Sequence, residues 1–160
     1  MFYQIFHSFI GDFFILEQEG AIAMLHQDFS LLPSSATLSP TALLDKAKNQ
    51  LNSYFKGELK DFSLPFVLSG SEFEKRIYQE LSLIAYGETL SYQDLAHRIN
   101  SPHSARAVGN ALGKNPLLLL IPCHRVICKN GTLGGYVLGG EKKRELLELE
   151  GYTSYISKQI

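Results

Sequence analysis

The pattern of apolar residues changes near Gly70, and this change constrains the fold more than any other feature of the chain. Residues 2–27 form three short apolar segments separated by turn residues, a pattern typical of a β-meander. Beyond the glycine, apolar residues recur at helical spacing. We therefore predict an α+β protein, with a small α/β domain over residues 1–70 and a mostly helical domain over residues 71–160.

The first region is predicted to form a small antiparallel sheet with one helix. The helix is an amphipathic segment, residues 41–57, with leucine, alanine and phenylalanine at helical spacing and a glycine at its end. Three strands precede it, and they are the segments FYQIFHSFI, FFILEQ and AIAMLHQ. Each strand is short and the turns between them are tight, as in a meander of sequential neighbours.

The second region contains a predicted helix-turn-helix. A first helix is expected to run from a capping box at Ser71 to about Tyr86, and a second begins at Ser91. Turn residues 100–102 separate this second helix from a third, HSARAVGNALG. Two helices joined by a three-residue turn have the spacing of a helix-turn-helix, a motif that often binds DNA.

The last helix of this motif carries almost no bulky side chain. Ala105, Ala107 and Gly109 occur along it and Arg106 projects alone, although glycine costs about 1 kcal/mol of helix stability relative to alanine. A helix this slim can approach another backbone closely. That backbone is either DNA or a second protein helix, and the local sequence favours neither.

Charge is distributed unevenly, although the formal net charge of the chain is only −1. Residues 1–70 carry four Lys or Arg and seven Asp or Glu, a net charge of −3, whereas residues 71–160 carry eleven and nine, a net charge of +2. No acidic residue lies between Asp94 and Glu141, an interval with five Lys or Arg residues. A phosphate backbone is the natural partner for such a surface, and the alternative is a solvated face balanced by acidic groups elsewhere in the fold.

The segment NPLLLLIPCHRVI places a thiol, Cys123, beside an imidazole, His124, after an apolar run. A cysteine attacks only as a thiolate, and a free thiol with a pKa of about 8.5 needs a base or a positive neighbour to ionise at neutral pH. Adjacent side chains diverge in a regular strand or helix, but Pro122 predicts a bend where the two groups could interact directly or through water. The alternative is a buried small residue beside a satisfied histidine.

Several other kinds of site are not predicted. A disulfide between Cys123 and Cys128 would close a very small loop, so we expect reduced thiols in a cytoplasmic protein. The N-terminus lacks the basic region and cleavage site of a signal peptide, and the longest apolar run is far shorter than the roughly 20 residues of a membrane span. His7 and His26 are too few ligands for a zinc site, and we expect neither a metal nor a cofactor.

Five segments of the second region occur in the order GETLSYQDLA, ARAVGNALGKNP, IPCHRV, GTLGGYVLGG and KRELLELEG. Over residues 73–151 the chain resembles the O6-alkylguanine-DNA alkyltransferases, suicide repair proteins that transfer an alkyl group from guanine O6 to a cysteine. The resemblance implies a ribonuclease H-like N-terminal domain of structural or regulatory role, a winged helix-turn-helix domain and a monomer. The implied partner is double-stranded DNA containing O6-alkylguanine, bound through the minor groove, and whether O4-alkylthymine is also a substrate is left open.

The resemblance assigns the chemistry to five residues. Cys123 matches the alkyl acceptor, His124 the base that ionises it through a water, and Glu150 the carboxylate that orients and charges the imidazole. This is the logic of a catalytic triad applied to a single turnover. Tyr92 matches the tyrosine that crowds the DNA phosphate and protonates the departing guanine, and Asn115 matches the asparagine that braces the turn before the active-site strand.

The resemblance also assigns residues to DNA and to the base pocket. Arg106 matches the arginine that enters the base stack at the place of the extruded guanine. The other residues implied to contact DNA are Ser91, Tyr92, Ala105, Ala107 and Gly109. Those implied to form the guanine pocket are Leu112, Leu118, Val126, Tyr136 and Val137. In that pocket the N–H of Val137 would donate to O6, and the backbone near Val126 would accept from the guanine amino group.

Two other functions are compatible with parts of this pattern. Alkyltransferase-like proteins share the helix-turn-helix and the arginine and bind damaged guanine without transferring anything, but they lack the acceptor that Cys123 supplies here. A sequence-specific transcription regulator would need a set of large side chains that read bases in the major groove, and the slim helix lacks such a set. We therefore predict direct-reversal DNA repair by stoichiometric alkyl transfer.

Overall fold

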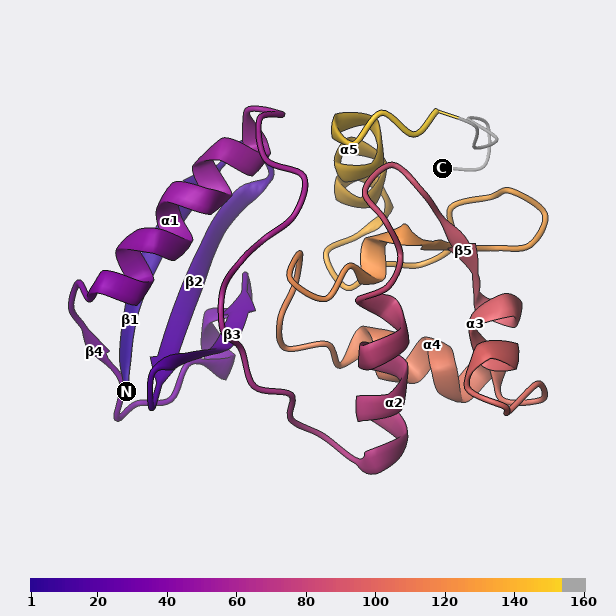
Figure 1. Ribbon diagram of the computed structural model, residues 1–160, viewed down its shortest axis with the longest axis horizontal. Helices are drawn as coiled ribbons and strands as arrows, with labels where there is room; N and C mark the ends of the chain where they lie inside the picture. Colours follow the sequence, from indigo (N-terminus) through magenta and orange to yellow (C-terminus); the bar gives the residue numbers. More distant parts are fainter. Residues whose placement is uncertain (154–160) are drawn as a thin grey trace. The chain divides into compact units, whose positions relative to one another are not determined.

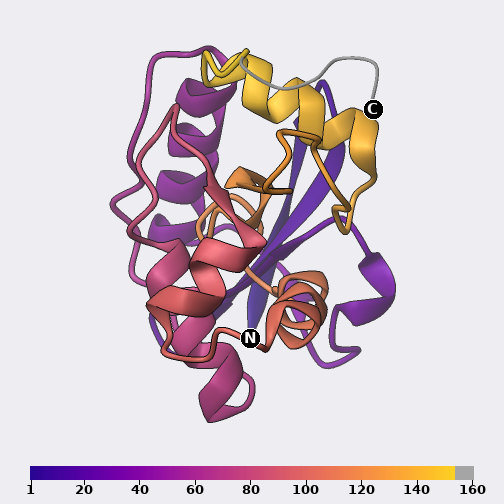
Figure 2. The same cartoon turned by 90° about the vertical axis from the view of Figure 1, so that its right-hand side faces the viewer.

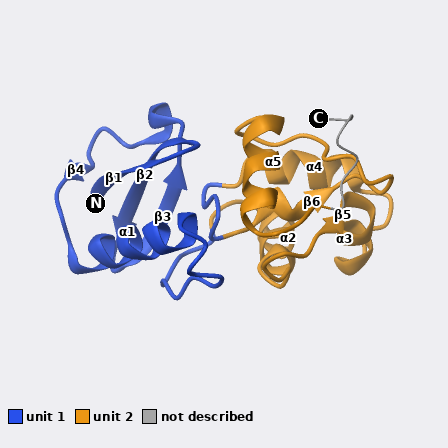
Figure 3. Ribbon diagram, turned by 90° about the horizontal axis from the view of Figure 1, so that it is seen from above, with its two compact units in different colours: residues 1–68, 116–120 blue, residues 69–115, 121–160 orange. Residues whose placement is uncertain are grey.

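The computed structural model describes residues 1–153, and it divides into two compact units (Figure 3). Unit 1 comprises residues 1–68 and 116–120, and unit 2 comprises residues 69–115 together with the chain from Ile121 onward. The short segment 116–120 is thus separated in sequence from the rest of its unit. Across the described chain, every helix is too short or too polar to cross a membrane.

Unit 1 is a four-stranded sheet with one long helix, α1 (Ala42–Phe55), lying along it (Figure 1). The strand order is β3-β2-β1-β4, and the strands are β1 (Phe2–Ser8), β2 (Gly11–Gln18), β3 (Ala21–His26) and β4 (Thr37–Leu38). The first three strands are antiparallel, as predicted. The two-residue β4, which is parallel to β1, is an addition that the sequence pattern did not predict.

Strand β2 forms the centre of this unit, and its apolar residues are buried on both faces of the sheet. The side chains of successive strand residues point to opposite faces of a sheet, so those of Phe13 and Phe14 lie on different faces. Phe13 lies 6.3 Å from Phe55 of α1 between ring centroids, and Phe14 lies 5.4 Å from Phe29 of the short 3-10 helix η1 (Phe29–Leu31). The helix α1 therefore covers one face, and η1 covers part of the other.

The segment 116–120 extends the edge of the sheet beside β3. The N–H of Leu25 donates to the carbonyl of Pro116 at 2.9 Å, and the N–H of Leu118 donates to the carbonyl of Leu25 at the same distance. Leu117 and Leu118 are fully buried. The apolar run before Cys123 thus belongs to the core of unit 1, while the thiol itself belongs to unit 2.

Unit 2 is mostly helical, with α3 packed on α4 as the predicted helix-turn-helix (Figures 1 and 2). Its elements are α2 (Glu72–Leu81), β5 (Leu90–Ser91), α3 (Tyr92–Arg98), α4 (Ala105–Gly113), the 3-10 helix η2 (Cys123–Arg125), β6 (Val126–Ile127) and α5 (Gly140–Leu149). The two short strands pair in parallel. The α+β prediction is confirmed.

The helix α2 begins as predicted and ends earlier than predicted. Its capping box is formed, with the N–H of Glu74 donating to Ser71 Oγ at 3.1 Å. The helix stops at Leu81 instead of near Tyr86, because the chain continues in tight turns such as the one from the N–H of Ile84 to the carbonyl of Leu81. Ile84 remains buried, which is why its position continued the helical spacing.

Candidate active site

Cys123 occupies the first position of the 3-10 helix η2, directly after Pro122. The N–H of Cys123 donates to the carbonyl of Ile121 at 2.8 Å, and the N–H of Arg125 donates to the carbonyl of Pro122 at 3.0 Å. The bend predicted from the proline is therefore one tight helical turn. It leads into β6, whose pairing with β5 holds the far end of the turn.

The side chain of Asn115 holds this turn from the end of α4. It is fully buried, and its Nδ2 donates to the carbonyl of Ile121 at 2.8 Å and to Cys123 Sγ at 3.2 Å. Burial raises the pKa of the Cys123 thiol to about 11, an effect that the Asn115 hydrogen bond partly opposes. At neutral pH the resting nucleophile is a neutral thiol in a fixed position.

His124, Arg125 and Glu150 form a buried ionic network behind the thiol. His124 Nε2 lies 2.8 Å from Glu150 Oε2, and Arg125 contacts both carboxylate oxygens, with Nε at 2.7 Å and Nη2 at 3.0 Å. Arg125 Nη1 also donates to the carbonyl of Ile84 at 2.7 Å. Burial alone would raise the pKa of Glu150, but His124 and Arg125 together hold it well below its usual range. The carboxylate is therefore ionised, and both His124 and Arg125 bind it.

The imidazole of His124 is a neutral base in this network. Burial lowers its pKa, and the opposing effect of Glu150 is smaller. A carboxylate only accepts hydrogen bonds, so Nε2 carries the ring proton and Nδ1 keeps the free lone pair. Nδ1 is buried without a hydrogen-bond partner among the described residues. A thiolate can thus form at Cys123 only as the thiol proton moves to a base such as this nitrogen.

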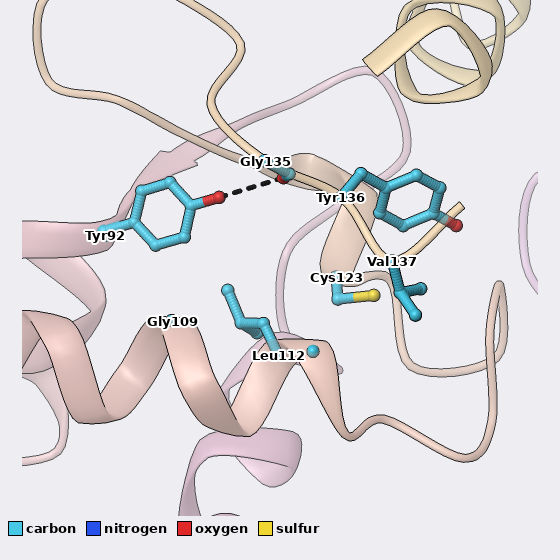
Figure 4. A pocket seen from close by; sticks show the side chains of 8 residues that line it. Tyr92, Gly109, Leu112, Cys123, Gly135, Tyr136 and Val137 are labelled. Carbon is cyan, nitrogen blue, oxygen red and sulfur yellow. Dashed lines mark hydrogen bonds between the residues drawn. The ribbon is translucent and has the colours of Figure 1, made fainter. Parts of the chain in front are cut away.

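The thiol opens into a pocket of about 390 Å³ (Figure 4). The residues lining it come from α3, α4, η2 and the loop before α5, and they are Tyr92, Gly109, Leu112, Gly113, Cys123, Gly135, Tyr136 and Val137. Figure 4 shows the Cys123 sulfur pointing toward Val137. The pocket is the size of those that bind small organic groups, and its walls are mostly apolar or backbone.

Tyr92 is one of two tyrosines that line the pocket. Its hydroxyl donates to the carbonyl of Gly135 at 3.2 Å (Figure 4). Burial raises the pKa of Tyr92 to about 12, so the hydroxyl keeps its proton at neutral pH. The chain around Gly134 lies close to this ring: a Cβ added there would sit 3.0 Å from Tyr92 Cε2, and the backbone φ of +72° is itself one that favours glycine.

The helix α4 connects the pocket to an exposed face. Val108, Ala111 and Leu112 are its buried residues, and Tyr78 donates a hydrogen bond to the carbonyl of Ala111 at 2.9 Å. Ala105, Arg106 and Ala107 are exposed on the opposite side. The small residues of α4 therefore leave a face free for a close approach, next to a pocket that the same helix lines through Leu112.

Three residues predicted for the base pocket or for DNA contact are buried and do not line the pocket. Val126 and Leu118 are fully buried and do not line the pocket, and Leu118 belongs to unit 1. Ser91 is buried and uses its hydroxyl to accept from the N–H of Asp94 at 3.0 Å, as the cap of α3. Their contacts with a base or with DNA remain predictions.

Two buried basic residues of the site were not predicted from the sequence. Arg125 follows the Cys-His pair directly, and the apolar residues Val126 and Ile127 come after it, which is the signal that could have marked it as an interior ion. Lys143 lies in the charged run EKKRE, which is typical of a solvated helix. The sequence pattern therefore gives no sign that this side chain is fully buried.

Fold and site together define a class of protein. A helix-turn-helix with a bare exposed helix is suited to nucleic acid, and a buried thiol with a neutral base and a polarised carboxylate is suited to nucleophilic transfer. Within the described chain no group of three or more His, Cys, Asp or Glu side chains could hold a metal ion. The class is therefore a DNA-binding transferase that uses a cysteine.

Comparison with known families gives the same result in more detail. The model for the 6-O-methylguanine DNA methyltransferase DNA-binding domain matches residues 72–152, and that for the ribonuclease-like domain of the same proteins matches residues 1–68. The chain belongs to the 6-O-methylguanine DNA methyltransferase family. This confirms the resemblance stated above, the ribonuclease-like first domain and the transferase class.

Individual relatives cover most of the chain. A methylated-DNA–protein-cysteine methyltransferase of Mycobacterium tuberculosis is 45% identical over 129 residues, which cover 81% of this chain and 78% of the relative. One of Methanosarcina acetivorans is 38% identical over 154 residues, covering 94% and 99%. The crystal structure of M. tuberculosis OGT in complex with DNA superposes with a TM-score of 0.88 at 40% identity, covering 94% of this chain and 92% of that one.

Proposed function

We propose that the protein repairs double-stranded DNA by moving an alkyl group from guanine O6 to Cys123 in a single irreversible turnover. The observation that carries this proposal is the pocket itself: the Cys123 thiol opens into it, and Asn115 fixes the sulfur from behind. O4-alkylthymine carries its alkyl group on an exocyclic oxygen in the same way, so it is a second substrate to test.

The reaction balances with the groups in the site. The thiol proton passes to His124 Nδ1, directly or through a water, and Glu150 stabilises the resulting imidazolium. The sulfur attacks the alkyl carbon, a C–S bond forms, and the C–O6 bond breaks with its electron pair going to the guanine. Tyr92 donates its proton to the guanine, and the proton held by His124 replaces it through solvent. The product thioether has no good leaving group, so the protein acts once.

The target base has to leave the duplex before this reaction. A base inside the stack cannot reach a buried thiol, and extruding it costs a few kcal/mol. The exposed residues of α4 are small apart from Arg106 and Asn110, which supports an approach to the minor groove with Arg106 filling the space that the base leaves. Phosphates would be contacted by the exposed basic residues of the interval without acidic groups, Arg98, Lys114 and Lys129. Arg125 of that interval is buried against Glu150.

The test is intact mass after mixing the protein with a duplex that contains one O6-methylguanine, followed by peptide mapping. We expect one added methyl group on Cys123, saturating at one per protein, and no change with an unmodified duplex. Binding to the lesion without a mass change would contradict the proposal and indicate a recognition protein of the alkyltransferase-like kind. A duplex with O4-methylthymine tests the second substrate in the same way.

Arg106→Ala is expected to slow methyl transfer from duplex DNA by about tenfold or more, because the extruded state loses the side chain that fills the stack. Reaction with free O6-benzylguanine needs no extrusion and should change by less than about twofold. Arg98→Ala is the matched control, since Arg98 is exposed on α3 and its loss removes the same charge. Equal losses on duplex and free base would contradict the role of Arg106.

A further inference from the structure

Lys143 has an unusual position for a lysine on a charged helix. It lies in the first half of α5, where its neighbours in sequence are charged, yet its side chain is fully buried. Burial lowers its pKa to about 8, so the ammonium remains largely protonated at neutral pH. A buried cation needs compensating contacts, because desolvation otherwise strongly disfavours its charged form.

Those contacts are three backbone carbonyls. Nζ donates to the carbonyl oxygen of Val126 at 2.6 Å, to that of Leu133, and to that of Gly135 at 2.9 Å. An ammonium has three N–H donors, so these carbonyls use its full capacity. Nζ also lies 3.5 Å from the Tyr92 hydroxyl and 5.6 Å from the centroid of the Tyr92 ring.

The carbonyls belong to two segments that meet at the pocket. Val126 follows the active-site turn, whereas Leu133 and Gly135 belong to the loop before α5 that supplies Gly135, Tyr136 and Val137 to the pocket wall. Tyr92 donates to the same Gly135 carbonyl that accepts from Lys143. A single cation thus joins the strand below the thiol, the loop over the pocket and the tyrosine at its wall.

Removing the cation would leave three carbonyl dipoles facing one another in the interior. A buried carbonyl that loses its hydrogen-bond donor destabilises the arrangement, and like dipoles repel. The strand is held by its pairing with β5, whereas the loop has no regular secondary structure from Gly131 to Gly139. The loop is therefore the part that would move, and the pocket wall would move with it.

We infer that Lys143 is a positioning residue, which holds the loop 133–137 and the Tyr92 hydroxyl in place around the base that reacts with Cys123. This inference rests on the proposed function. It predicts that Lys143 controls the rate of the chemical step and leaves DNA binding and the stoichiometry unchanged, because the hydrogen bonds of the ammonium go to the β6 strand, the loop and Tyr92. A displacement of about 1 Å at a reacting group can cost up to about a hundredfold in rate.

The test compares Lys143→Met with the wild-type protein in single-turnover methyl transfer from a duplex containing O6-methylguanine. We expect the limiting rate to fall by at least about tenfold, while the half-saturating DNA concentration stays within about twofold and every folded protein still accepts one methyl group. Lys143→Arg, which keeps a cation with N–H donors, should recover part of the rate. Amide hydrogen exchange in residues 131–137 should be faster in Lys143→Met than in wild type.

Lys46→Met serves as the control, because Lys46 is an exposed lysine of α1 that lies outside the pocket and the basic interval, and it should match wild type in every measurement. An unchanged limiting rate in Lys143→Met would overturn the inference. So would a normal rate with fewer methylated molecules, since a residue needed only for folding lowers the active fraction and not the rate. A wild-type protein that transfers no methyl group would overturn the proposed function and this inference with it, whereas the two preceding results leave the proposed function standing.

Discussion

Glu150→Gln is expected to slow methyl transfer to Cys123 by about a hundredfold or more, without loss of DNA binding. Glutamine keeps the shape of the side chain but removes the charge that stabilises His124 as it takes up the thiol proton, and general acid–base contributions are typically of this size. The same change leaves the buried Arg125 without its counter-ion, which should cost roughly 3 kcal/mol of stability. Single-turnover rates and urea unfolding measure the two effects separately.

Glu148→Gln is the matched control for this variant. Glu148 is exposed and pairs with Arg144 at 3.3 Å, a contact worth at most about 0.5 kcal/mol, so its rate and stability should equal those of wild type. An unchanged transfer rate in Glu150→Gln would remove Glu150 from the mechanism. Loss of DNA binding together with activity would instead point to a general collapse of unit 2.

The pH dependence of stability gives an independent check on Glu150. Its pKa in the folded protein lies below the unfolded value, so its contribution to stability is fully present above the ordinary glutamate pKa of about 4.3. That contribution is lost as the pH falls from there through the folded-state pKa. Wild type should therefore lose more stability on acidification than Glu150→Gln does over the same interval, as measured by the melting temperature at each pH.

The fold could be predicted where local patterns decide it. Alternation and turn residues predicted the meander of β1, β2 and β3, and capping residues with helical spacing predicted α2, α3 and α4. The return of residues 116–120 to the edge of β3 could not be predicted, because an apolar run does not specify which distant strand it will join. The early end of α2 was missed because burial of Ile84 continues the apolar pattern after the helix has ended.

The sequence was sufficient to predict the nucleophile of the candidate site. It was not sufficient to predict the buried cations that support it. Cys123 and His124 are adjacent in the sequence, and the surrounding motif gave their roles by resemblance. Arg125 and Lys143 act on carboxylate and carbonyl groups that are brought to them only by the fold, from Glu150 and from Gly135 respectively. The residue type alone does not distinguish a buried cation from a solvated one. The difference becomes visible only in the contacts that the folded chain makes with the side chain.

Asn115→Ala is expected to lower the rate of methyl transfer by roughly a hundredfold, mainly through the position of the sulfur. The variant loses the hydrogen bond to Cys123 Sγ and leaves the buried carbonyl of Ile121 without its side-chain donor. The Ile121 carbonyl keeps the N–H of Cys123 as a partner, so the lost hydrogen bond should cost about 1 kcal/mol of stability, and a shift of about 1 Å in the thiol accounts for the rate. Single-turnover transfer and thermal unfolding provide the measurements.

Asn49→Ala is the control, because Asn49 is an exposed asparagine in the middle of α1 and its loss should leave both measurements unchanged. The hydrogen bond from Asn115 also lowers the pKa of Cys123, so its loss should raise that pKa further and make the rate more dependent on alkaline pH. If the transfer rate of Asn115→Ala equals that of Asn49→Ala, then Pro122 and the pairing of β5 with β6 are sufficient to fix the turn. The precision of the thiol position would then come from the backbone alone.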